Sequence, residues 1–378
     1  MSEPPLTILV ADDSALYRQM LVNVLRLCPG VEVVGVAADG GDTVAKVASL
    51  RPDVVTLDVR MPVLNGIDVL RALRAQGSTA RVIMVSSLTG DGDPTTVEAL
   101  LEGAFDYVLK PVGLDPHLAR ESLRTSLVEK LAHIRALLRP TAIPATPVVP
   151  AATHAPRSHD VRPQPVRLPY DAVAIGTSTG GPEALRALLP ALPADLPVPV
   201  LLVQHMPPHF TATLAARLDE MSPIAVVEAA TGMPVQAGRV HVAVGGRHLR
   251  VAVHGHAVSC DTDEGPPRHG CRPSFDVLLE SLVEAHEGRV LAVVLTGMGC
   301  DGLEGCTRLK KRGGTVVAQS PATCAVYGMP KAVVEHGLAD AILPLDAIAR
   351  FISAAVLGRL PHRDGGQPST SESTSSAT

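Results

Sequence analysis

The feature that most constrains the fold is an alternation of short apolar runs with amphipathic stretches, which occurs twice along the chain. The first series runs from Leu6 to about Ser126, and the second runs from Tyr170 to about Leu357. Such alternation is typical of a parallel sheet with helices on both faces. We therefore predict two doubly wound α/β domains. The second has a mostly parallel sheet and, at residues 251–259, an antiparallel hairpin.

The segment between the two series has a different composition. A helical pattern begins near Asp115, and residues 139–169 are then rich in Pro, Ala and Thr. They contain too little apolar pattern for a core, which indicates an extended linker. The Ser- and Thr-rich end of the chain indicates a disordered tail. The predicted parts are a first domain, a helix with a Pro-rich linker, a second domain and a tail, at residues 1–126, 127–169, 170–357 and 358–378.

Composition narrows the classes of function. The 378 residues have a net charge of -5, aromatic residues make up 2 %, and tryptophan is absent. A broad nucleic-acid surface is therefore not expected, because basic patches and stacking side chains are both scarce. We find no run of about 18 apolar residues and no signal-peptide pattern at the start. We expect a cytoplasmic protein without membrane insertion.

The six cysteines form no CxxC pair, and we expect free, buried thiols. A zinc site made by Cys260, His269 and Cys271 is the alternative. It lacks the paired ligand spacing that such sites usually show.

Polar residues follow the apolar runs of the first domain at the positions where strands should end. Asp12 and Asp13 follow the first run, and Asp58 ends the third. Ser86 lies at the end of the fourth apolar run, and Lys110 ends the fifth. Because function in an open parallel sheet gathers at the carboxyl ends of strands, we expect these five side chains to converge.

Three converging carboxylates repel one another, and hard oxygen ligands suit Mg²⁺. One carboxylate could then accept a phosphoryl group, with Lys110 adding positive charge and Ser86 a hydroxyl donor. Any one of these residues alone is more simply explained as a solvated loop residue. Their joint occurrence in order favours a common site.

Four motifs in the first domain resemble those of a response-regulator receiver domain, which has a flavodoxin-like fold. The resemblance implies that Asp58 accepts a phosphoryl group from a histidine kinase and that Asp12, Asp13 and Asp58 hold Mg²⁺. It implies that Ser86 and Lys110 sense the phosphate. The motifs are "VADDS", "LDVRMPVLNG", "VSS" and "YVLKP".

In the second domain, the sequence "GTSTG" (residues 176–180) follows an apolar run and precedes a helical pattern with Pro182 in its first turn. This fits a G-x-S-x-G elbow, in which glycines allow a sharp turn that exposes Ser178. Free N–H groups at the helix start could equally receive a phosphate or a developing oxyanion. The loop alone leaves a nucleophile, an anion cradle and a plain connection open.

Two further polar residues end apolar runs in this domain, namely His205 and Asp301. With Ser178 they would share one edge of a parallel sheet, which is the geometry of a Ser–His–Asp triad. Their order along the chain differs from that of α/β-hydrolases. Spacing alone leaves two alternatives, because Asp301 could be a turn residue and other histidines could serve. Those histidines are His209, His241, His248, His254 and His256.

Further motifs are similar to the catalytic domain of the chemotaxis protein-glutamate methylesterase family (CheB), which joins a receiver to this domain. The similarity implies that Ser178 is the nucleophile, His205 the general base and Asp301 the residue that orients the base. It places Thr179 beside the serine and the backbone N–H of Met298 at the oxyanion. The motifs are "IGTSTGGPEAL", "QHMPPHF", "RPSFDVLLESL", "LTGMGCDG" and "AVYGMPKAV".

The resemblance implies a phosphorylation-activated esterase that hydrolyses glutamate methyl esters on the cytoplasmic domains of chemoreceptors. Some relatives also deamidate receptor glutamines, and no cofactor is expected at the catalytic site. The unphosphorylated receiver should cover the edge of the sheet that carries the serine. The alternative is a non-catalytic, phospho-dependent binding module in a two-component pathway, in which the Gly-rich loop holds an anion.

Overall fold

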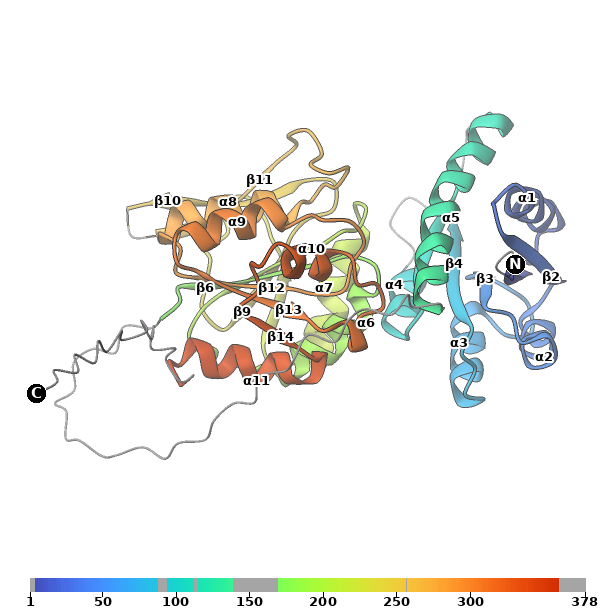
Figure 1. Ribbon diagram of the computed structural model, residues 1–378, viewed down its shortest axis with the longest axis horizontal. Helices are drawn as coiled ribbons and strands as arrows, with labels where there is room; N and C mark the ends of the chain where they lie inside the picture. The colour runs from blue at the N-terminus through green and yellow to red at the C-terminus, as the bar shows by residue number, and fades with distance from the viewer. Residues whose placement is uncertain (1–3, 88–93, 112–114, 139–168, 256, 360–378) are drawn as a thin grey trace, which may run out of the picture.

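The computed structural model describes residues 4–87, 94–111, 115–138, 169–255 and 257–359. The predicted Pro-rich linker and tail lie almost wholly outside these residues. Within them the chain forms two parallel sheets flanked by helices, together with one antiparallel hairpin (Figure 1). The prediction of an α/β fold with two doubly wound sheets is confirmed.

The first sheet has the strand order β2-β1-β3-β4-β5, and every neighbouring pair is parallel. This is the flavodoxin-like order, in which the connections change direction beside β1 and β3. Strand β3 reads VVTLD and is buried along its whole length, as a strand covered on both faces must be. The strands are β1 (Leu6–Ala11), β2 (Val31–Ala37), β3 (Val54–Asp58), β4 (Arg81–Ser87) and β5 (Asp106–Lys110).

Helices of the first sheet begin at residues that cap them. Ser14, Asp39 and Asn65 each accept a hydrogen bond from a backbone N–H of the first turn. Of the helices that the structure describes, none is both long and apolar enough to cross a membrane. The helices are α1 (Ala15–Arg26), α2 (Gly40–Leu50), α3 (Gly66–Ala75), α4 (Pro94–Leu101) and α5 (Pro116–Leu138).

The second sheet has the order β14-β13-β12-β6-β7-β9-β8, again with parallel neighbours. The connections change direction where β6 lies between β12 and β7, which is where polar residues at strand ends can meet. The strands are β6 (Ala172–Thr177), β7 (Val200–Gln204), β8 (Ala225–Glu228), β9 (Arg239–Val242), β12 (Val290–Val294), β13 (Thr315–Gln319) and β14 (Ala341–Leu343).

The predicted hairpin is confirmed as a separate antiparallel pair beside α8. Its strands are β10 (His248–His254) and β11 (Ala257–Asp263). Helices on the two faces of the second sheet are α6 (Gly181–Leu188), α7 (Phe210–Met221), α8 (Phe275–His286), α9 (Leu303–Lys311), α10 (Met329–Glu335) and α11 (Leu345–Val356).

The apolar cores of the two sheets join through helices. In Figure 1, α4 lies beside the helices α6 and α7 of the second sheet. Val97 and Leu101 of α4 belong to the same buried cluster as Leu185 of α6 and Leu214 of α7. Aliphatic residues dominate this cluster, as the low aromatic content requires. The carboxyl edge of the second sheet is thereby placed against the first domain.

Phe275 is the first residue of α8 and belongs to the buried core beside this edge of the sheet. Its side chain is fully buried, and a methyl group added at Gly176 of β6 would lie 2.3 Å from its ring. The ring therefore packs directly on the strand that leads to Ser178.

We predict that Phe275→Ala lowers the free energy of unfolding of the second domain by about 3–5 kcal/mol, because it removes a buried ring and leaves a cavity. Urea denaturation followed by circular dichroism measures this loss. The matched control is Phe351→Ala, since Phe351 of α11 is only partly buried and should cost less. Equal losses for the two variants would contradict the packing role of Phe275.

Candidate functional site

Three polar residues predicted from the sequence lie at the carboxyl edge of the second sheet. Ser178 follows β6, His205 follows β7, and Asp301 lies in the loop between β12 and α9. Because β12, β6 and β7 are neighbours, the sheet order brings these loops together. The structure thus gathers the three residues at one edge.

Backbone and side-chain hydrogen bonds hold the serine loop against its neighbours. The backbone N–H of Ser178 donates to the carbonyl of Thr296 (3.0 Å), and the Gln204 amide donates to the Ser178 carbonyl (2.9 Å). Gly180 has φ +76° and precedes α6, a left-handed conformation that favours glycine. The Ser178 hydroxyl is partly exposed and makes no hydrogen bond to any described residue. The loop is held rigidly while its hydroxyl stays available.

Asp301 is almost fully buried, and its carboxylate takes part in four hydrogen bonds. Its Oδ2 lies 2.7 Å from Nε2 of His205 and accepts from the backbone N–H of Phe275 (2.6 Å). Its Oδ1 accepts from the Ser274 hydroxyl (2.7 Å) and from the backbone N–H of Asp276 (3.1 Å). The start of α8 therefore fixes the carboxylate that orients His205, since free N–H groups there favour a negative charge.

The remaining ring nitrogen of His205 faces Cys271, which the sequence analysis named only as a possible zinc ligand. Nδ1 lies 3.5 Å from Sγ of Cys271, while Nε2 is occupied by Asp301. Nδ1 is therefore the ring nitrogen that Asp301 leaves free, and it lies beside the thiol. No hydrogen bond joins Ser178 to His205 in the described contacts. A lone cysteine offered no sequence signal for this contact.

The state of the six cysteines agrees only in part with the prediction of free, buried thiols. All six are free, but Cys271, Cys300 and Cys324 are partly exposed. The zinc alternative at Cys260, His269 and Cys271 is not formed, because Cys260 contacts His241 and Cys271 contacts His205.

The contact between His205 and Asp301 shifts the pKa values of both side chains. Burial lowers the pKa of His205, but the Asp301 hydrogen bond and Cys271 outweigh it and raise the pKa to about 9. Burial raises the pKa of Asp301, and the His205 contact and the α8 donors reverse this, lowering the pKa to about 2. The raised pKa of His205 and the lowered pKa of Asp301 both favour the charged forms of the two side chains in this arrangement.

The predicted carboxylates of the first sheet also converge. Nζ of Lys110 lies 2.8 Å from Oδ2 of Asp12 and 2.8 Å from Oδ2 of Asp58. Asp12 and Asp58 are buried, whereas Asp13 is exposed. Burial raises the pKa of Asp58 despite Lys110, and the two carboxylates raise the pKa of Lys110 despite burial. Ser86 is buried nearby on β4, where its hydroxyl accepts from Thr96 of α4 (2.7 Å).

The first-sheet carboxylates fit a magnesium ion. One oxygen from each of Asp12, Asp13 and Asp58 lies within 4.8 Å of the others. Oδ2 of Asp12 and Oδ2 of Asp58 are buried and face the same Nζ of Lys110, and hard carboxylate oxygens gathered in this way suit Mg²⁺. Mg²⁺ held here would neutralise negative charge beside Asp58.

The receiver sheet covers the serine edge of the second sheet. The Thr179 hydroxyl donates to Oδ2 of Asp106 (2.6 Å), which also pairs with Nζ of Lys130 (2.7 Å). The rings of Tyr107 and Phe210 stack at 5.6 Å. The cavity beside Ser178 measures about 90 Å³ and is lined by residues that include Leu100, Phe105, Ser178, Gln204, His205 and Met206.

The fold and the two sites define a class of protein, a receiver joined to an α/β domain of hydrolase type. Residues 8–120 match the family described as response regulator receiver domain, and residues 173–352 match the family described as CheB methylesterase.

Relatives over nearly the whole chain agree with this class. Proteins named protein-glutamate methylesterase/protein-glutamine glutaminase are 46 % identical in Symbiobacterium thermophilum (93 % of this chain, 97 % of the relative) and 43 % identical in Nocardioides sp. (90 % and 93 %). One from Geobacillus kaustophilus is 43 % identical (91 % and 97 %). The chain therefore belongs to the protein-glutamate methylesterase/protein-glutamine glutaminase family.

We predict that Asp301→Asn lowers the pKa of His205 from about 9, because burial then acts without an opposing negative charge. A pH titration of the His205 ring by NMR measures the change. Ser274→Ala, which removes one donor but keeps the carboxylate, serves as the control and should move the pKa less. A midpoint that stays near 9 in Asp301→Asn would show that another group protonates the ring.

Proposed function

We propose that this protein is a phosphorylation-activated protein-glutamate methylesterase. It hydrolyses glutamate methyl esters on chemoreceptor cytoplasmic domains, releasing methanol, and by the same chemistry deamidates receptor glutamines. The observation that carries the proposal is the 2.7 Å contact between His205 and the buried Asp301, beside the unbonded hydroxyl of Ser178. Membership of the family supports the substrate class. The site of action is the cytoplasm, where these receptor domains lie.

The proposed reaction is acyl transfer through Ser178. Its Oγ bonds to the ester carbonyl carbon while Nδ1 of His205 takes the hydroxyl proton. The tetrahedral intermediate then breaks the bond to methoxide, which receives that proton and leaves as methanol. Water, deprotonated by His205, cleaves the acyl-enzyme and restores Ser178. Asp301 holds Nε2 and stabilises the charged ring. Because only the neutral ring can take the proton, activity rises with pH through the pKa of His205.

Backbone N–H groups of Thr179 and Met298 are the proposed oxyanion donors. A methyl group added at Gly297 would lie 2.9 Å from Cβ of Ser178, so this loop approaches the serine closely. Only glycine permits that approach, and the N–H of the next residue, Met298, is the second donor of the proposal. Donors fixed in this way need no reorganisation as charge develops.

In the proposed resting state the receiver blocks this reaction. The 90 Å³ cavity above Ser178 has no room for a glutamyl ester on a receptor helix. Polar and apolar contacts hold the receiver domain over the cavity. They include the hydrogen bond between Thr179 and Asp106 and the stacking of Tyr107 on Phe210. Opening must expose the serine and let Nδ1 of His205 reach it.

Phosphorylation of Asp58 by a histidine kinase is the proposed opening signal. Lys110 ends β5 at the phosphorylation site, and Asp106 begins the same strand at the interface. Ser86 bonds to Thr96 in α4, the helix that packs against α6 and α7. A phosphate on Asp58 draws Ser86 and Lys110 toward it. This alters the position of β5, which carries Asp106, and the hydrogen bond from α4 to Ser86. The population of molecules then shifts toward the open state.

We predict that Ser178→Ala lowers methanol release from methylated receptor by roughly 10⁴-fold or more, because the nucleophile is lost. Radiolabelled methyl groups on the receptor allow the release to be measured, and circular dichroism checks the fold. The wild-type protein should also yield a trapped acyl-serine at residue 178. Full activity of the variant, or binding of receptor without turnover by the wild type, would favour the non-catalytic binding module.

We predict that Tyr107→Ala raises the unphosphorylated rate by up to about 10-fold, because loss of ring stacking weakens the closed state. Tyr107→Phe keeps the ring and should retain the low rate.

Acetyl phosphate with Mg²⁺ should raise the rate of methanol release by the wild type but leave the rate of Asp58→Asn unchanged. A phosphorylated wild type with an unchanged rate would refute the switch.

A further inference from the structure

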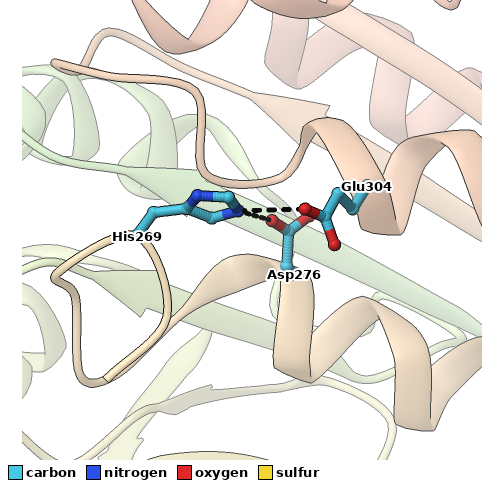
Figure 2. A group of neighbouring side chains, drawn as sticks. All are labelled: His269, Asp276 and Glu304. Carbon is cyan, nitrogen blue, oxygen red and sulfur yellow. Dashed lines mark ion pairs between the residues drawn. The ribbon is translucent and has the colours of Figure 1, made fainter. Parts of the chain in front are cut away.

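A group of three side chains outside both sites converges on one point. His269 lies in the loop before α8, Asp276 in the first turn of α8, and Glu304 in the first turn of α9 (Figure 2). Nε2 of His269 is 3.2 Å from Oδ2 of Asp276 and 3.4 Å from Oε1 of Glu304. One ligand atom from each residue lies within 4.8 Å of the others.

Each carboxylate uses one oxygen for the protein and directs the other into the shared space. Oδ1 of Asp276 accepts from the backbone N–H of Gly305 (2.6 Å), and Glu304 pairs through Oε2 with Arg268. The Asp276 side chain is completely buried, and its Oδ2 makes no well-formed hydrogen bond but faces Nε2 of His269 at 3.2 Å. A buried carboxylate oxygen without a well-formed hydrogen bond is costly, and a cation bound between it and the ring nitrogen would satisfy it.

We propose that His269, Asp276 and Glu304 bind one divalent transition-metal ion of the Zn²⁺ class. Ligands that form bonds of about 2.0–2.2 Å to zinc stand roughly 3.0–3.5 Å apart, which is the spacing found around Nε2. One imidazole with two carboxylates suits Zn²⁺ or Mn²⁺ better than Mg²⁺ or Ca²⁺, which favour oxygen ligands alone. His269 and Glu304 are 33 % and 50 % exposed, so an ion can enter and water can complete its coordination.

This metal site lies directly behind the catalytic carboxylate. The backbone N–H of Asp276 donates to Asp301, and the loop that carries His269 also places Cys271 against His205. An ion that joins this loop to α8 and α9 therefore fixes the surroundings of the His205–Asp301 pair. It touches neither the substrate nor Ser178, so its role is structural positioning.

Isothermal titration of the full-length, chelator-treated protein with Zn²⁺ tests the proposal. Excess Mg²⁺ present throughout occupies the carboxylates of the first sheet. We expect one Zn²⁺ per chain and a raised melting temperature, with His269→Ala weakening binding by about 10-fold or more. His269 is exposed enough that this variant should fold, which circular dichroism checks. The matched control is His254→Ala in the exposed hairpin, which should bind as the wild type does.

Substitution of Cys271 identifies the ligands independently. Cys271→Ser should retain Zn²⁺ binding, because the thiol is not among the proposed ligands. Co²⁺ at the site should give visible absorption bands that His269→Ala removes. Absence of stoichiometric Zn²⁺ binding would overturn the proposal and identify the group as an ion pair around protonated His269. Binding that survives His269→Ala but is lost in Cys271→Ser would also overturn it.

Discussion

The buried negative charge of Asp301 is the constraint on which the second domain depends. A carboxylate at 2 % exposure is stable only if donors replace the water it has lost, and the N-cap and first two residues of α8 supply three of them. The fourth partner is His205, whose ring is thereby fixed. Phe275 supplies one of these N–H groups while its side chain packs on β6, so the same residue stabilises the core and the site.

The interface with the receiver uses the same edge of the sheet that the proposed reaction needs. Thr179, next to the proposed nucleophile, donates its hydroxyl to Asp106 of β5. The apolar cluster around α4, α6 and α7 is continuous with the cores of both sheets. Covering the site is therefore coupled to core packing, and opening it exposes apolar surface that a receptor helix could cover in turn.

Much of this arrangement follows from sequence, because residues at the ends of parallel strands must share an edge. The convergence of Asp12, Asp58 and Lys110, and the contact between His205 and Asp301, follow from strand order in this way. The nitrogen that faces Asp301 depends on the ring orientation, which periodicity does not encode. Contacts such as Cys271 with His205 and Asp106 with Thr179 join segments whose approach is set by loop path and domain docking. The roles of the predicted catalytic residues remain proposals.

The small volume left above Ser178 has a consequence for selectivity among ordinary cell metabolites. A space of about 90 Å³ holds roughly three water molecules, each with a share of about 30 Å³. Bulky esters and thioesters among the cell's metabolites exceed that space, so under the proposed mechanism the closed enzyme would be shielded from acylation by them as well as by the receptor. The proposed switch would then confine hydrolysis to periods of signalling and suppress futile turnover between them.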